Sequence, residues 1–446
     1  MRIFGRPGRR LQTALCKFAL IAKETRGNIA VITALISPLL IATMGLGAES
    51  SYWYALQRGM QNAADAAVIA AASNGTTTYA QEAQAVASQM GYQNGVNNIV
   101  VNATQAPNCV SGAACYSVTV SEAVPVFLGQ LIGFGGDTTV NGSPAVLISA
   151  TAKSVQGTIA RNYCLLALGS STDAIRGNGV PATNFAGCNI MSDGGSLCNG
   201  HNMGAGFGDA HLTDSGCGVA QDSNLPTVPD PYISLRAFIP ANPCSSYPQE
   251  PGKNGTPLPV SNLWSGNVTL PATYFVCGDL QLTGNVTITS ASPGSVLVIE
   301  NGQLDTNGYT FATAQGSAIT ILFSGTSGTY THAPTGGGTL NIQAPSSGDW
   351  SGVAVYQDPS LTTGVDIASA GNQPTWDITG LFYAPNSNIT FSGAVNKSSY
   401  GASCFVLVSS TVYVSGTGAI FETGGCDQAG LAMPTNIVAG RGALIG

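Results

Sequence analysis

The residues whose types and spacing come closest to a reactive site form one polar cluster in a glycine-rich stretch. Its members are Asp209, His211, Asp214 and Asp222. Carboxylate and imidazole groups are ligands for calcium or zinc, so this cluster is a candidate metal site. The competing interpretation is a polar surface loop held by Cys198 and Cys217, and we favour it. The sequence therefore predicts no metal and no other cofactor.

Signs of catalysis are weak elsewhere in the chain. Glycoside hydrolysis needs two carboxylates about 5–10 Å apart, and most acids of the C-terminal part stand alone. Lyase chemistry usually needs a basic residue, and only five cations follow Arg161. Four aromatic residues are candidates for stacking on sugars or, as we favour, for packing inside the fold: Trp350, Tyr356, Trp376 and Tyr383. We expect no catalytic residues, and a carbohydrate-active enzyme is the least favoured alternative.

Charge is scarce and unevenly distributed. Only 8% of the 446 residues are charged, against roughly 25% in ordinary soluble domains. Residues 1–26 carry a net charge of +6, whereas the remainder carries −13. This composition excludes an ordinary cytosolic enzyme and a coiled coil. The acidic remainder argues against nucleic acid as a partner, because phosphates require clustered Lys and Arg.

An uncharged apolar run extends from Asn28 to Ala48. About twenty helical residues span the roughly 30 Å hydrocarbon core of a bilayer, and Pro38 is tolerable within such a helix. The basic flank predicts a cytoplasmic N-terminus, with the bulk of the chain on the other side. A cleaved secretory signal is the alternative, but its apolar part would be shorter, about 7–15 residues.

The residues after the apolar run favour a retained anchor. An alanine-rich stretch follows Glu49 and should continue the same helix out of the membrane. Tyr52 and Trp53 lie where an interfacial aromatic belt is expected. Glu49 itself has two interpretations. It is a charge that pairs with a partner helix, or it is a solvated residue at the outer interface, where an acid costs much less than at the bilayer centre.

The order of features over residues 27–72 resembles the N-terminal segment of the TadG-like proteins of bacterial Flp (tight-adherence) pilus assembly. The matching parts are the basic flank, Gly27-Asn28-Ile29-Ala30, the apolar span, Glu49, the aromatics and the block Gln61-Asn62-Ala63-Ala64-Asp65-Ala66-Ala67. The resemblance implies a bacterial inner-membrane protein with an external domain, used in surface adhesion. Glu49 lies too far from Gly27 for a processed pilin, so we do not expect cleavage by a prepilin peptidase.

Candidate membrane or partner-helix contacts follow from the same region: Pro38, Glu49, Tyr52, Trp53, Gln61, Asn62 and Asp65. Ten of the eleven cysteines lie beyond the apolar run, and an even number in an oxidising compartment indicates disulfides. Zinc is the competing account for these thiols. Proximity suggests one pair, Cys109 with Cys115.

A small α/β unit should follow the first helix, which we expect to end at Ser73-Asn74-Gly75. Residues 79–90 predict a short helix, and β-branched runs around 99–101, 116–120, 124–128 and 146–148 predict an antiparallel sheet. The alanine face of residues 60–72 would pack on this sheet, as in a pilin-like domain. An apolar group interrupts the strand pattern: Phe127, Leu128, Leu131, Ile132 and Phe134. It is a membrane or partner patch, or, as we favour, part of the sheet core or a loop tucked under it.

Short apolar runs bounded by Gly, Asn, Ser or Pro recur after about residue 160. Strands of this length suit a β-sandwich or a parallel β-helix. We favour a right-handed parallel β-helix, because pairs of strands repeatedly flank short polar corners that can stack between coils.

The predicted fold class is therefore mainly β, with four parts. These are a cytoplasmic flank (1–26), a transmembrane helix (27–48), a helical stalk with a pilin-like α/β domain (49–155) and a disulfide-containing β-solenoid (156–446). We expect a non-enzymatic, single-pass component of Flp pilus assembly in the bacterial inner membrane. Its partners would be the membrane and pilus-assembly proteins, with a surface glycan and self-association left open. The alternative is a pilus-independent adhesin or envelope-polysaccharide-binding protein.

Overall fold

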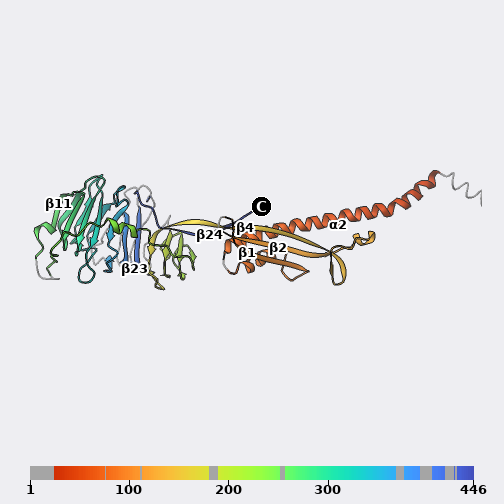
Figure 1. Ribbon diagram of the computed structural model, residues 1–446, viewed down its shortest axis with the longest axis horizontal. Coiled ribbons are helices and arrows are strands. Elements are labelled where there is room, and N and C mark those ends of the chain that lie inside the picture. Colours follow the sequence, from red (N-terminus) through yellow and green to blue (C-terminus); the bar gives the residue numbers. More distant parts are fainter. Residues whose placement is uncertain are drawn as a thin grey trace, which may run out of the picture. The chain divides into compact units, whose positions relative to one another are not determined.

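The computed structural model (Figure 1) describes residues 25–75, 77–110, 113–179, 189–251, 257–367, 376–391, 404–416, 426 and 429–445. The chain forms two compact units. Unit 1 comprises Met1–Ile159 and Ala439–Gly446, and unit 2 comprises Ala160–Val438. Unit 2 is therefore an insertion into unit 1, whose last residues return after the insertion. The sequence pattern placed this boundary near 155 and did not anticipate the return.

Unit 1 is built around α2, one unbroken helix of 50 residues from Thr25 to Asn74 with Pro38 inside it. The alanine-rich composition after the apolar run explains its continuity, because alanine has the highest helix propensity. Gly75 ends it in the left-handed region, and its N–H donates to the carbonyl of Ala71. The prediction of a single helix that leaves the apolar span and continues to residue 72 is confirmed.

The second half of α2 packs on a sheet and a short helix. The sheet pairs β1 (Ile99–Val110), β2 (Ala113–Pro125), β3 (Thr138–Val140) and the first part of β4 (Ser143–Ala167) in antiparallel fashion. The helix α3 spans Tyr79–Gln89. One face of α2 is fully buried against them and contributes Met60, Ala63, Ala64, Ala67, Val68, Ala71 and Ala72. Small side chains let the helix approach the sheet closely, as the sequence predicted.

Unit 2 is mainly β and its described strands pair in parallel. Its strands are β5 (Ile175–Gly179), β6 (Asn189–Ser192), β7 (Ser196–Asn199), β8 (Phe207–Ala210), β9 (Asp214–Ser215), β10 (Ala220–Asp222), β11 (Leu263–Thr269), β12 (Thr273–Cys277), β13 (Leu280–Thr289), β14 (Ser295–Glu300), β15 (Leu304–Asp305), β16 (Thr310–Thr313), β17 (Ile319–Ser324), β18 (Pro334–Thr335), β19 (Thr339–Gln343), β20 (Val353–Gln357), β21 (Val365–Ile367), β22 (Trp376–Phe391) and β23 (Phe405–Gly416). β24 (Thr435–Leu444) leads the chain back into unit 1. Parallel pairing does not fit the antiparallel sandwich that the sequence left open.

One ladder of unit 2 does not follow chain order. Its strands pair in the sequence β12, β14, β17, β20, β22, β23, β4, β6, β8 and β10. The chain therefore enters the ladder in the middle, at β4, and proceeds to β10. The return segment, residues 223–262, then carries the chain to the opposite end, where β11 and β12 begin. From there the strands lead back to β23, which pairs with β4.

Apolar residues occupy matching positions in successive strands of this ladder. The column reads Leu297, Ile321, Val355, Phe382, Leu407, Leu165 and Ile190, and every member is buried. These side chains form one continuous core across the meeting point of β23 and β4. The early and late parts of unit 2 therefore share a single hydrophobic core.

Three disulfides are described, and all lie in unit 2: Cys198–Cys217, Cys244–Cys277 and Cys404–Cys426. They confirm disulfides for these six cysteines, including the pair predicted to hold the polar cluster. Cys115 is also disulfide-bonded. The side chain of Cys109 lies outside the described residues, so the pairing of Cys109 with Cys115 stays a prediction.

Candidate functional site

The most constrained predicted site residue is Glu49, where the apolar half of α2 ends. Its side chain is only 8% exposed. Its two carboxylate oxygens accept hydrogen bonds from the backbone N–H groups of Phe127 and Gly129, each at 2.7 Å. Charge-assisted bonds of this kind are among the stronger ones in proteins. The interpretation of Glu49 as a solvated residue is therefore wrong, because the carboxylate ties α2 to a loop about eighty residues further along the chain.

That loop, residues 126–134, is called the apolar loop below. It begins where β2 ends at Pro125 and contains a single turn of 3-10 helix, Gly129–Ile132. Gly133 closes the turn with a positive φ, which favours glycine. A side chain at Gly129 would crowd the Glu49 carboxylate, because a Cβ there would lie 3.3 Å from Oε2. The loop conformation thus depends on its glycines as well as on Glu49.

The apolar loop exposes large hydrophobic side chains. Phe127 is 73% exposed and Leu131 is 78% exposed. Leu128, Ile132 and Phe134 are also exposed. The favoured interpretation of this group as sheet core or a tucked loop is wrong. The sheet already packs against the alanine face of α2, so the loop lies outside that core.

The remaining predicted site residues occupy different surroundings on α2. Pro38, Tyr52 and Asn62 are exposed, whereas Trp53 is half-buried and its ring lies 5.9 Å from that of Phe134. The Trp53 indole N–H is buried without a protein partner. Trp53 therefore joins Glu49 in holding the apolar loop against the helix.

Gln61 and Asp65 bond to each other rather than pointing freely outward. The Gln61 amide donates to Asp65 Oδ1 at 2.8 Å and to the carbonyl of Thr151 at 3.4 Å. These contacts connect α2 to β4. Partner-helix contacts of Pro38, Gln61, Asn62 and Asp65 stay predictions.

The polar cluster of unit 2 is organised by a residue that the sequence analysis did not connect to it. Arg161 donates to Asp209 and to Asp222, each at 2.7 Å, and Tyr163 donates to Asp209 at 2.6 Å. Burial raises the pKa of Asp209. His211 bonds instead to the carbonyl of Leu225. Two of the four predicted ligands therefore serve an internal ion network, because β4 brings Arg161 beside β8 and β10.

The four aromatic residues weighed for sugar binding are packed inside unit 2. Tyr356 and Tyr383 are fully buried and stacked, with ring centroids 4.8 Å apart. Trp350 packs against Tyr356, and Trp376 stacks on Phe382. The packing interpretation is therefore confirmed, and these rings present no stacking platform.

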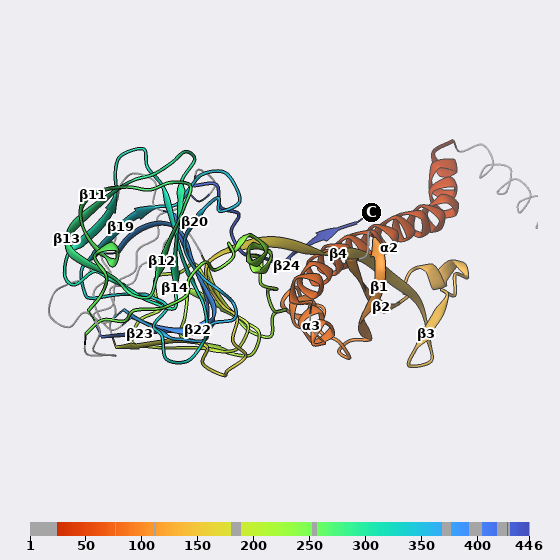
Figure 2. The ribbon, with the colours of Figure 1, turned by 60° about the vertical axis from the view of Figure 1, so that its left-hand side comes forward.

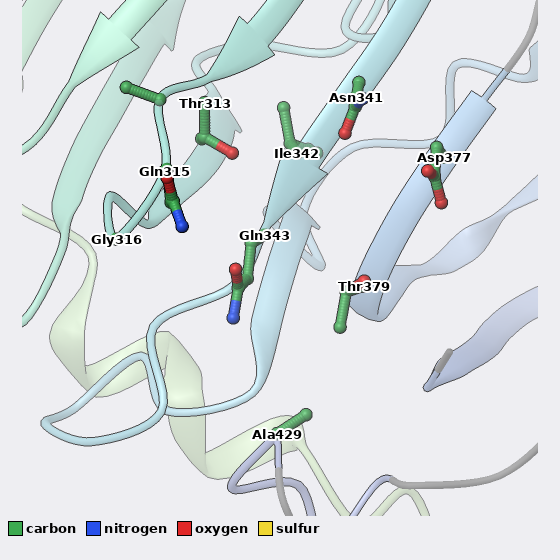
Figure 3. Close-up of a pocket in the computed structure, with 10 residues that line it drawn as sticks. Thr313, Gln315, Gly316, Asn341, Ile342, Gln343, Asp377, Thr379 and Ala429 are labelled. Carbon is green, nitrogen blue, oxygen red and sulfur yellow. The ribbon is translucent and has the colours of Figure 1, made fainter. Parts of the chain in front are cut away.

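A polar pocket of about 520 Å³ lies over β19 and β22 (Figure 3). Asn341 lies opposite Asp377, and Gln343 lies opposite Thr379, because the two strands pair in register. Gln315 and Ala429 also line the pocket. Amide, hydroxyl and carboxylate groups can hydrogen-bond a polar ligand. Among the described residues that line the pocket, none is aromatic, so these residues provide no stacking surface for a sugar.

Two acids of the strand region bind the return segment, and the sequence pattern did not predict these contacts. Glu300, at the end of β14, accepts a hydrogen bond from Asn242 of the return segment at 3.0 Å. Burial and the nearby Asp358 raise the pKa of Glu300 to about 7. Asp193, just after β6, accepts from the N–H of Val228, and burial raises its pKa to about 6. The sequence did carry one sign of these contacts. Each acid stands alone at the end of an apolar strand-like run, in a chain where charged residues are rare.

Comparison with known proteins gives one match, and it covers α2. Residues 27–74 match the model of a family described as putative Flp pilus-assembly TadE/G-like. No curated protein and no solved structure matches the chain. The match ends at the last residue of α2, so it relates this helix, and not unit 2, to that family.

Proposed function

We propose that this chain is a non-enzymatic, membrane-anchored component of Flp/Tad-type pilus assembly. The observation that carries the proposal is the coincidence of the TadE/G-like match, residues 27–74, with α2. The first half of this helix exposes apolar side chains to its surroundings, and one face of the second half is buried in unit 1. One helix of this kind can bind membrane partners while it carries an external body.

The proposed topology is a single span in the bacterial inner membrane with a cytoplasmic N-terminus. The apolar helix and the disulfides suggest a membrane-anchored protein whose bulk is extracytoplasmic. The basic flank supports this orientation, because positive residues remain on the cytoplasmic side. The exposed apolar residues around Leu35, Leu39 and Ile41 would then contact lipid and the helices of pilus-assembly proteins.

We further propose that unit 2 is a right-handed β-solenoid that presents a surface for protein or glycan contact. Parallel ladders and the buried apolar column through successive strands support it, because stacked coils bury one continuous core. β22 takes part in three ladders through residues 376–379, 381–384 and 388–391, as a strand that turns corners in a coil would. The polar pocket over β19 and β22 is then the candidate contact on this surface.

A pilus-independent adhesin is the second candidate function. The separate hydrophobic core of unit 2 favours it, because an inserted body can act without the rest of the assembly machinery. A carbohydrate-active enzyme is the least favoured of the three candidate functions. Asp209 and Asp222 are paired with Arg161, and the rings considered for sugar stacking are buried.

The test places a photo-crosslinking residue at Leu39, in the exposed apolar half of α2, in cells that make the full-length chain. We expect crosslinks to membrane proteins of the pilus machinery, and fewer or no pili when the chain is deleted. The matched control carries the same crosslinker at Val219, an exposed position of unit 2. Normal pili in the deletion strain with loss of surface attachment would instead support the adhesin. Normal pili and normal attachment would overturn both.

A further inference from the structure

We propose that the apolar loop, residues 126–134, inserts into the outer interface of the same bilayer that α2 spans. This second membrane contact rests on the proposed membrane anchoring. Its ligand is the lipid bilayer itself, at the boundary between headgroups and acyl chains. The loop would fix how unit 1 meets the membrane, which a single helix cannot do alone.

The first argument is position along α2. Leu128 packs against Gly45, since a Cβ at Gly45 would lie 3.3 Å from the Leu128 side chain. Gly45 lies inside the uncharged apolar run, which ends at Ala48. At about 1.5 Å per residue, this contact lies about 5 Å to the lipid side of the end of the run. Figures 1 and 2 both show the yellow-orange loop that follows β2 beside α2.

The second argument is that the apolar loop carries no charge and pairs many of its own backbone polar groups. Within 123–136 the sequence has no charged residue. The turn satisfies its own backbone through the N–H groups of Leu131, Gly133 and Phe134, which donate to carbonyls inside the loop. The Gln130 amide donates to the carbonyl of Val126. Irregular backbone is costly in a bilayer when its polar groups are unpaired, and these hydrogen bonds reduce that cost for the apolar loop.

Glu49 pairs two further backbone groups of the loop. Its carboxylate accepts the N–H groups of Phe127 and Gly129, which the turn itself leaves unpaired. The same two bonds pair the Glu49 carboxylate, which is the charged group of α2 next to the end of the apolar run. A charged residue and two backbone donors are therefore mutually satisfied where desolvation would otherwise be costly.

The third argument is the chemistry of the exposed surface. Phe127, Leu131 and Ile132 are exposed large apolar side chains of one short loop, and contiguous apolar patches mark interaction sites. Aromatic residues gather beside them on α2, where Tyr52 is exposed and Trp53 packs on Phe134. Tyr and Trp favour the membrane interface. Continuity with the apolar span therefore favours lipid over a second copy of the chain.

The experiment uses the full-length chain with Cys16 replaced by Ser and Leu131→Cys, labelled with bimane and reconstituted in phosphatidylcholine/phosphatidylglycerol vesicles. Leu131 is highly exposed, so this change leaves the core intact. We expect a blue-shifted emission and loss of intensity with lipids that carry a doxyl group near the headgroup. Lipids with the doxyl group near the chain end should quench less. The matched control is Leu444→Cys, another exposed leucine of unit 1, which lines a pocket with Gln61 and Asp65 far along α2.

A third labelled chain, Leu35→Cys, separates the two proposals. Quenching at Leu35 with none at Leu131 would overturn the loop insertion and leave the anchor in place. No quenching at either position would overturn the anchor as well. A label at Leu131 that is shielded from aqueous iodide but not quenched by doxyl lipid would assign the patch to a protein contact and also overturn the insertion. Equal quenching at Leu131 and Leu444 would do the same, because it would not be specific to the loop.

Discussion

At the scale of single residues, unit 1 depends on one carboxylate that serves two backbone donors. Glu49 is nearly buried, and its partners belong to a loop that is far away in the chain. The sequence identified Glu49 as a special position because it interrupts an uncharged run. It could not identify the partners, because backbone N–H groups carry no sequence signal.

Replacement of Glu49 by Ala should lower the free energy of unfolding of unit 1 by about 2–3 kcal/mol, since two N–H groups lose a charged acceptor. Glu49→Gln keeps one acceptor oxygen but turns its NH2 donor toward the other backbone N–H, so it should also destabilise unit 1, by about 1–3 kcal/mol. Chemical denaturation of the detergent-solubilised chain, followed by the change in tryptophan fluorescence that accompanies unfolding of unit 1, measures this. Glu82→Gln, at an exposed position of α3, is the control. Equal effects of the three changes would contradict the proposed role of Glu49 in holding the apolar loop on α2.

Glu300 makes unit 2 sensitive to pH. Its pKa is raised in the folded state to about 7 from an ordinary value of 4.5, so folding favours the protonated acid. The folded state binds more protons than the unfolded state between these values, and stability should therefore fall as pH rises from about 4.5 to about 7. The contribution is on the order of 3 kcal/mol.

Glu300→Gln should remove part of this dependence and raise the stability of unit 2 at pH 8 more than at pH 5. Thermal unfolding at the two pH values measures the difference. Asp349→Asn, at an exposed position of unit 2, should leave the dependence unchanged. A pH profile that Glu300→Gln does not alter would refute the assignment.

At the scale of elements, the alanine face of α2 determines how closely the helix and sheet approach. Ala64, Ala67 and Ala71 are fully buried in the core that α2 forms with the sheet and α3. The same helix carries apolar residues around its whole surface in its first half. The buried alanines therefore mark the part of α2 that packs within unit 1, in contrast to the exposed apolar part that precedes it.

Ala67→Leu should destabilise unit 1 by about 1–3 kcal/mol through overpacking. Ala55→Leu, on an exposed position of the same helix, should have little effect. Thermal unfolding of unit 1, followed by near-UV circular dichroism, compares the two chains. Similar melting temperatures for both variants would show that the interface has free space.

At the scale of the whole molecule, the chain enters the main parallel ladder of unit 2 at a central strand and not at an end. β4 is the first of its strands in the chain but lies between β23 and β6 in the ladder. The return segment makes this possible by connecting the two ends of the ladder. Cys244–Cys277 ties this segment to β12, and Asn242 bonds to Glu300. The part of the return segment around Asn242 and Cys244 is therefore bound to the strands of unit 2.

Replacement of both Cys244 and Cys277 by Ser should lower the stability of unit 2 by about 3–4 kcal/mol, because their disulfide closes a loop of intermediate length. Limited proteolysis should then cut the return segment first. The chain with Cys198 and Cys217 replaced is a control for loss of a disulfide elsewhere. Cleavage of the return segment at the same rate in both variants would contradict its dependence on this bond.

The sequence by itself determined the features that arise from local pattern. Residues 25–74 are helical because the apolar and alanine-rich runs favour helix, and the helix continues through Pro38 until Gly75 ends it. The strands follow β-branched runs between turn residues. Only the tertiary structure decided which segments meet. The bond from Glu49 to the apolar loop, the ion network of Arg161 and the pairing of β23 with β4 all join residues far apart in the chain. Such contacts depend on the path of the backbone in space, and neither periodicity nor composition encodes that path.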